Sequence, residues 1–154
     1  MISKRHFLKL ILNLYPPLFF NRIRVKKISN DYKEINVVLK KSIFNINFHK
    51  TIFGGSIFSA CDPYYPTMYY NIFKLQNKKL IIWVKDVEIK YLHPANSNLF
   101  LNFIIKSSQI KEIESNLKAN GKHEIKNEVL AINIEGITCA HAVITTYLRD
   151  PNAY

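Results

Sequence analysis

The sequence predicts an α+β domain in which an antiparallel sheet of about six strands wraps around one long, buried helix. Segment 55–73 is apolar on almost every face that a helix would present. Six further stretches have the apolar patterns of strands, and Glu135-Gly136 favours a tight hairpin between the last two. The apolar faces of such a helix are buried only when a sheet curls around it.

Length and composition favour one folded domain, spanning 1–154, and exclude other classes. The 154 residues, of which 48% are hydrophobic and 21% charged, can form a packed core, so the chain is not disordered throughout. Two cysteines, Cys61 and Cys139, are too few for a disulfide-stapled scaffold. No apolar run reaches about 18 residues, so we expect no membrane span.

Residues 1–20 predict a short helix and a Pro-Pro turn. Ser3 is placed to cap this helix, and Pro16-Pro17 would end it. Apolar residues recur at i, i+3, i+4 and i+7, and we expect this stripe to dock on the domain. The stripe comprises Phe7, Leu10, Ile11 and Leu14. Association with a membrane surface is the minor alternative. No signal-peptide cleavage site follows, so we expect a cytoplasmic location.

The remaining elements follow in chain order. Strands are predicted at 23–28, 35–39, 80–92, 99–105, 125–134 and 137–148. A loop is predicted at 41–54, and an extra surface helix at 108–120 ends at Gly121, before the last hairpin. Six strands around one long helix make the hotdog fold. One copy leaves a side of that helix and a sheet edge uncovered, so we expect a homodimer or a tetramer.

The charge of the chain is strongly basic. Lys and Arg number 22 against 11 Asp and Glu, a formal net charge of +11, which is typical of proteins with polyanionic partners. The excess of Ile, Asn and Lys is also typical of an AT-rich genome, and we interpret the basic residues as dispersed. Because no RNA-binding aromatic motif or zinc-finger spacing accompanies them, we expect no nucleic-acid partner. A basic nucleic-acid-binding protein remains a third hypothesis.

Gly54, Gly55 and Asp62 form the most informative group of residues. The glycines allow a ligand to approach the main chain at the start of the buried helix, where free N–H groups can stabilise an oxyanion. Asp62 lies two turns further along, where burying a carboxylate is costly without partners. On the residues alone, a simple turn and a water-facing carboxylate are equally good explanations.

Two prolines follow the carboxylate. Pro63 and Pro66 have no N–H, so the carbonyls of Ser59 and Asp62 lose their helical partners. We expect a kink beside Asp62 that either bends the helix around the sheet or aims the carboxylate into a cleft.

The same segment resembles the signature of hotdog-fold acyl-coenzyme A thioesterases of the phenylacetate-degradation type. Asn47 matches the family's Asn, Gly54-Gly55 its paired glycines, and Asp62 its catalytic aspartate; Tyr91-Leu92-His93-Pro94-Ala95 resembles its Phe-Leu-Arg-Pro-Gly strand end. A bacterial branch of this superfamily, described as a domain of unknown function, is more similar still. Residues 13–17, 53–58 and Asp62-Pro63 carry this similarity. Phe53 replaces the family's His, Lys50 its first Gly, and His93 the Arg of many relatives.

This resemblance implies hydrolysis of an acyl-coenzyme A thioester without a metal or a cofactor. Asp62 would be the general base or the nucleophile, the Gly55 N–H would polarise the carbonyl, and Asn47 would position the water or the acyl group. The residues expected to line the substrate site are Phe53, Gly54, Ser56, Tyr65 and His93. A non-catalytic acyl-coenzyme A or lipid-binding protein is the alternative.

Other chemistries do not match the spacing of their residues. Gly54-Gly55-Ser56 is not a Gly-x-Ser-x-Gly elbow, and the five histidines show no metal-binding spacing with acidic or cysteine partners. Cys61, Cys139 and His141 are interpreted as packing residues.

Overall fold

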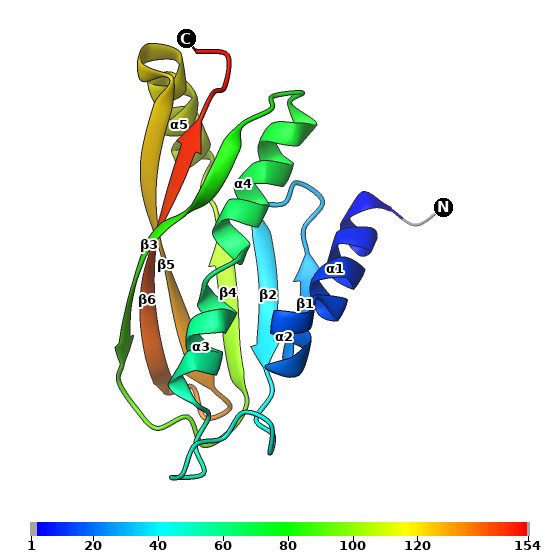
Figure 1. The fold of residues 1–154 in the computed structure, drawn as a ribbon, viewed down its shortest axis with the longest axis vertical. Helices are drawn as coiled ribbons and strands as arrows, with labels where there is room; N and C mark the ends of the chain where they lie inside the picture. The colour runs from blue at the N-terminus through cyan, green and yellow to red at the C-terminus, as the bar shows by residue number, and fades with distance from the viewer. Residues whose placement is uncertain (1–2, 154) are drawn as a thin grey trace.

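A computed structural model describes residues 3–153, so Met1, Ile2 and Tyr154 of the predicted domain lie outside the described part (Figure 1). The elements are α1 (Lys4–Leu14), α2 (Pro16–Phe20), β1 (Ile23–Ile28), β2 (Glu34–Leu39), α3 (Gly54–Cys61), α4 (Tyr64–Leu75), β3 (Ile81–Tyr91), β4 (Leu99–Ile104), α5 (Ser107–Asn120), β5 (Lys122–Asn133) and β6 (Thr138–Arg149). Their arrangement confirms the predicted hotdog fold.

One antiparallel sheet has the strand order β1-β2-β4-β5-β6-β3, and α3 and α4 lie along its inner face (Figure 1). In β4, Leu99, Leu101 and Phe103 are buried, whereas the alternate residues are exposed. The register pairs these three with Leu39, Val37 and Ile35 of β2, which are also buried. This alternation places every second side chain against the helices.

The predicted helix over 55–73 is divided at Asp62-Pro63 into α3 and α4. The missing N–H of Pro63 explains this break. The break confirms the predicted kink beside the carboxylate. One face of α4 packs on the sheet and comprises Tyr64, Tyr65, Met68, Tyr69, Ile72 and Phe73. The ring centroids of Tyr64 and Tyr65 lie 4.7 and 5.2 Å from the ring centroid of Phe103.

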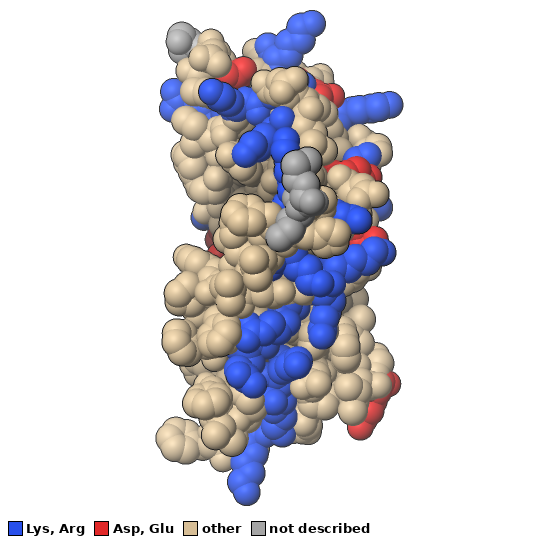
Figure 2. Space-filling model, turned by 90° about the vertical axis from the view of Figure 1, so that its right-hand side faces the viewer, with Lys and Arg blue, Asp and Glu red and all other residues tan. Residues whose placement is uncertain are grey.

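The two edges of the sheet differ. Along the β1 edge, the side-chain amide of Asn13 donates to the Val25 carbonyl at 3.2 Å and accepts from the Val25 N–H at 2.7 Å. Figure 2 views this edge and shows a strip of Lys and Arg along it. Strand β3 forms the opposite edge and pairs with β6 alone within residues 3–153. An uncovered edge of this kind is available to a further strand.

The predicted orientation of the first helix is wrong. Phe7, Leu10, Ile11 and Leu14 face solvent, and the helix docks instead through buried Leu12 and half-buried Leu8. Ser3 occupies the N-cap position, but its hydroxyl pairs with the His6 ring at 2.8 Å and does not cap the main chain. Pro16 starts α2 and does not only end α1.

The C-terminal elements lie where they were predicted. Helix α5 buries Ile110, Ile113 and Leu117 and ends at Gly121, whose φ of 68° is left-handed. Strands β5 and β6 form the last hairpin, and the Asn133 side chain accepts hydrogen bonds from the N–H groups of Glu135 and Ile137 in its turn. None of the helices within residues 3–153 is long and apolar enough to cross a membrane.

Candidate active site

The start of α3 presents unused N–H groups. The Phe53 carbonyl accepts from Ser56 N–H at 2.9 Å and from Ile57 N–H at 3.3 Å. The N–H groups of Gly54 and Gly55 have no acceptor among residues 3–153. They lie at the positive end of the helix dipole, where a negatively charged oxygen is stabilised.

Two aromatic rings lie against the glycines at the start of α3. A Cβ on Gly55 would collide with the Phe53 ring, and one on Gly54 would meet the Tyr91 ring at 3.1 Å. The Tyr91 hydroxyl also donates to the Gly54 carbonyl at 3.0 Å. Tyr91 therefore joins the end of β3 to the start of α3. No sequence pattern predicts this role of Tyr91, although the residue opens the segment that resembles the thioesterase strand end.

Asp62 closes α3 with a half-buried carboxyl group. Its N–H donates to the Phe58 carbonyl at 3.2 Å, but within residues 3–153 its carboxylate has no hydrogen-bond or ion-pair partner. Burial raises the pKa of Asp62 above its usual range. The group therefore combines partial burial, an unpaired charge and a weakened acidity, which suits a general base.

Cys61 is adjacent in sequence but chemically inert. Its thiol is fully buried, and burial, with the charge of Asp62 as a smaller cause, raises its pKa to about 12. The interpretation of Cys61 as a packing residue is supported, since a thiol with this pKa is not a nucleophile near neutral pH.

Asn47 shapes the loop before α3. Its side-chain oxygen accepts from His49 N–H at 3.0 Å and Thr51 N–H at 3.2 Å, and its amide donates to the Thr51 hydroxyl at 2.8 Å. These bonds hold a turn over 47–51, and Phe53 N–H continues the anchoring by donating to the Asn45 carbonyl. They give Asn47 a structural task, and its catalytic task stays a prediction.

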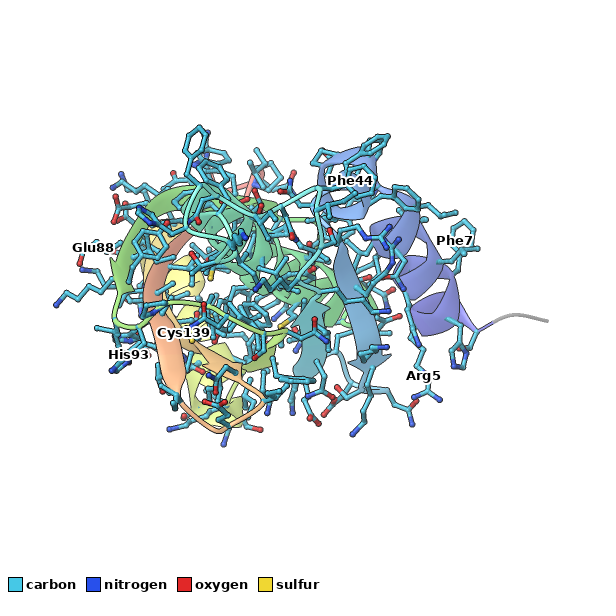
Figure 3. All side chains as sticks on the ribbon, turned by 90° about the horizontal axis from the view of Figure 1, so that it is seen from below. Arg5, Phe7, Phe44, Glu88, His93 and Cys139 are labelled. Atoms are coloured by element: carbon cyan, nitrogen blue, oxygen red, sulfur yellow. The ribbon has the colours of Figure 1, made fainter. Side chains whose placement is uncertain are left out.

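The other predicted substrate-site residues are less closely gathered. The Ser56 hydroxyl is buried and donates to the side-chain oxygen of Asn21 at 2.7 Å. Tyr65 is buried against the sheet, where its hydroxyl donates to the Glu128 carbonyl. His93 is exposed beyond β3, beside Cys139, with its ring 2.9 Å from the Thr138 carbonyl (Figure 3). Phe53 and Gly54 lie at the α3 start, whereas Ser56 and Tyr65 point into the core.

A groove of about 620 Å³ runs along the outer side of α4. It begins at Pro66 and Thr67, one turn after Asp62, and continues past Tyr70 to the apolar residues Phe7 and Ile11 of α1. Asp62 does not line this groove. Within the described chain, no three His, Cys, Asp or Glu side chains lie close enough to hold a metal ion.

Comparison with solved structures shows the same fold in other proteins, some of which are described as thioesterases or probable thioesterases. A Pseudomonas aeruginosa protein of unknown function, described as a probable thioesterase, is 14% identical, with a TM-score of 0.79 over 97% of each chain. A Haemophilus influenzae thioesterase is 10% identical, with a TM-score of 0.72 over 100% of this chain and 96% of that one. The PaaI protein of the E. coli phenylacetic acid degradation operon is 13% identical, with a TM-score of 0.66 over 96% and 95%.

At these identities the likeness shows the fold alone. No curated protein matches the chain. A family model described as a domain of unknown function (DUF4442) matches residues 3–148, nearly the whole length. The predicted fold resemblance to hotdog thioesterases is confirmed, and the chain belongs to the DUF4442 family, the predicted bacterial branch of unknown function.

Proposed function

We propose that this protein hydrolyses an acyl-coenzyme A thioester, with Asp62 as the general base. The observation that carries the proposal is the half-buried Asp62 carboxylate, which lacks a partner within residues 3–153 and follows a helix whose first two N–H groups are free. A base and an oxyanion site are the two groups that acyl transfer to water needs. The thioesterase names of the solved relatives support the same reaction class.

The reaction follows from these groups. The thioester carbonyl accepts hydrogen bonds from Gly54 and Gly55 N–H, and a water molecule attacks its carbon while the Asp62 carboxylate takes a proton from that water. The carbon–sulfur bond then breaks, the thiolate leaves and takes up the proton, and a carboxylic acid remains. Direct attack by Asp62, through an anhydride that water later cleaves, is the other route that these residues allow.

The proposed site is shared between two copies of the chain. Gly55 and Asp62 are seven residues apart, which is about 10 Å along a helix. Within one chain, a carbonyl bound to the Gly55 N–H and its attacking water would have to extend almost fully along the helix to reach Asp62, so we favour a shared site. A dimer joined through the open β3 edge would bring the α3 start of one copy beside Asp62 of its partner.

Release of free thiol from short, long and aromatic acyl-coenzyme A esters tests the proposal. Asp62→Asn should lower the rate at least about 10²-fold, the usual contribution of a general base. Glu135→Gln, which changes an exposed carboxylate in the β5–β6 turn, is the matched control and should leave the rate unchanged. Both cysteines are buried, so the protein itself contributes little to a thiol-reagent signal.

Two results would contradict the proposal. Full activity in Asp62→Asn would exclude Asp62 as base and as nucleophile. Saturable binding of acyl-coenzyme A by the wild-type protein, with no thiol release from any ester of the panel, would instead establish a non-catalytic binding protein.

A further inference from the structure

The positive charge is concentrated in the first part of the chain and is not dispersed as the sequence analysis had it. Residues 1–61 contain 11 Lys and Arg and only two Asp and Glu, so they carry a formal charge of +9 of the total +11. Both acidic residues, Asp31 and Glu34, belong to the β1–β2 connection and the start of β2. The first 30 residues contain no acidic side chain, so α1, α2 and β1 form a purely basic edge.

The same edge carries exposed apolar side chains, which we call the apolar ridge. Each exposes between 37% and 73% of its surface. The ridge comprises Phe7, Leu10, Ile11, Leu14, Tyr15, Phe19, Phe20 and Phe44. Four of these form the α1 stripe, which is not covered by any core residue of the described chain. An apolar patch of this extent on a folded protein marks an interaction surface.

Basic side chains border the ridge closely. The guanidinium of Arg24 lies 4.5 Å from the Phe19 ring centre, and that of Arg22 lies 5.9 Å from the Phe44 ring centre. Lys9 donates to the Lys26 carbonyl at 2.7 Å, which aligns α1 with the basic edge strand. Figure 2 shows the resulting strip of Lys and Arg, and Figure 3 shows Phe7 and Arg5 pointing outward from this edge.

We propose that the α1–α2 edge docks on the surface of an anionic phospholipid bilayer. Exposed aromatic and aliphatic side chains on a short amphipathic helix can enter the headgroup region, while bordering Lys and Arg contact the lipid phosphates. A protein partner is disfavoured because protein interfaces are depleted of Lys. A nucleic acid would use the basic strip but would leave the aliphatic residues of α1 in water.

This docking is compatible with the rest of the molecule. The ridge lies on the β1 side of the sheet, whereas the open edge belongs to β3 on the opposite side (Figure 1). Pairing of two copies through β3 therefore leaves both ridges accessible. The inference concerns binding and does not rest on the proposed hydrolase activity.

Vesicle cosedimentation with the full chain tests the inference. Vesicles of phosphatidylglycerol and phosphatidylcholine should bind the protein, pure phosphatidylcholine should bind it at least about ten-fold more weakly, and high salt should weaken binding. Phe7→Ser/Leu10→Ser/Phe20→Ser and Lys4→Gln/Lys26→Gln/Lys40→Gln should each lower the affinity for anionic vesicles at least about ten-fold.

Matched controls change the same residue types elsewhere. Phe100→Ser/Ile104→Ser/Leu130→Ser alters exposed apolar residues on the outer face of the sheet, and Lys111→Gln/Lys118→Gln/Lys122→Gln removes three charges around α5. Both should bind vesicles like the wild type. Equal loss in ridge and control variants, or no vesicle binding by the wild type, would overturn the inference. The inference would also be overturned if the wild type bound no vesicles and the ridge variant lost self-association or DNA binding.

Discussion

The Asp62 carboxyl occupies a position that costs folding stability. Partial burial removes water from the carboxylate, and no side chain within residues 3–153 returns a hydrogen bond or a positive charge. A purely structural residue at the end of α3 would be better served by a neutral amide. This unpaired carboxylate is consistent with the proposed role of Asp62 as a base, which needs its charge.

This cost gives a stability prediction for Asp62→Asn. Because the folded-state pKa is raised, the ionised form is favoured in the unfolded chain, and near neutral pH the charge destabilises the fold. Asp62→Asn should therefore raise the melting temperature at pH 7. The gain should shrink as the pH falls through the raised folded-state pKa and vanish below the usual pKa of Asp, where both states are protonated.

Thermal unfolding across this pH range checks the sign of the change in melting temperature, with Glu135→Gln as the control for an exposed carboxylate. A melting temperature that falls in Asp62→Asn at pH 7, or a gain that grows towards acid, would show that the ionised carboxylate is stabilised by its surroundings.

At the residue scale, the sequence predicts which chemistry-bearing residues share the central helix, because glycine and a buried carboxylate are rare there. It does not predict which side chains close the site. Ser56 and Tyr65 face the core, where their hydroxyls bond to partners 35 and 63 residues away in the sequence. Tyr91 approaches Gly54 across 37 residues of sequence, a contact that no local pattern encodes.

At the element scale, helix α1 protects the edge of the sheet. Asn13 bonds to both main-chain groups of Val25, close to the point where the β1–β2 register shifts. The amide side chain thus imitates one residue of a neighbouring strand. Arg24 returns a hydrogen bond to the Asn13 carbonyl at 3.0 Å, which fixes the helix against the strand.

We therefore expect Asn13→Ala to lower the free energy of unfolding by about 1–3 kcal/mol, because it leaves the Val25 N–H and carbonyl unpaired at a partly buried edge. It should also increase aggregation through the exposed strand. Chemical denaturation and light scattering measure the two effects. Asn30→Ala, an exposed change in the following turn, is the control. Unchanged stability in Asn13→Ala would show that α1 is held by Leu8 and Leu12 alone.

Helix α1 also shows where periodicity fails. The i, i+3, i+4, i+7 pattern correctly predicts an amphipathic helix, but it does not say what covers the apolar side. In a single chain the nearest core is the default partner, and that default is wrong here. Strands are predicted more reliably, because the alternation of apolar and polar side chains in a strand such as β4 leaves one face for the core and one for solvent.

At the scale of the whole molecule, the two sheet edges differ in what covers them and in their charge. The β1 edge is covered by α1 and is basic, whereas β3 keeps a free edge of 11 residues within the described chain. An antiparallel dimer through β3 would place the basic, apolar edges at its two ends. In such a dimer the proposed site would be shared, with Gly55 of one copy beside Asp62 of the other.

Subunit complementation tests this shared arrangement. Asp62→Asn removes the base, and Gly55→Pro removes the N–H donor in the first helical turn, where no intrahelical bond is lost and the exposed Phe53 ring can move aside. Each variant alone should be inactive. If sites are shared between copies, exchange of subunits in an equimolar mixture makes about half the dimers mixed, each with one intact site, and restores about a quarter of wild-type activity. Circular dichroism and light scattering of each parent confirm that it is folded and dimeric. A folded, dimeric mixture that stays inactive would place both groups in one chain's site and refute the shared arrangement.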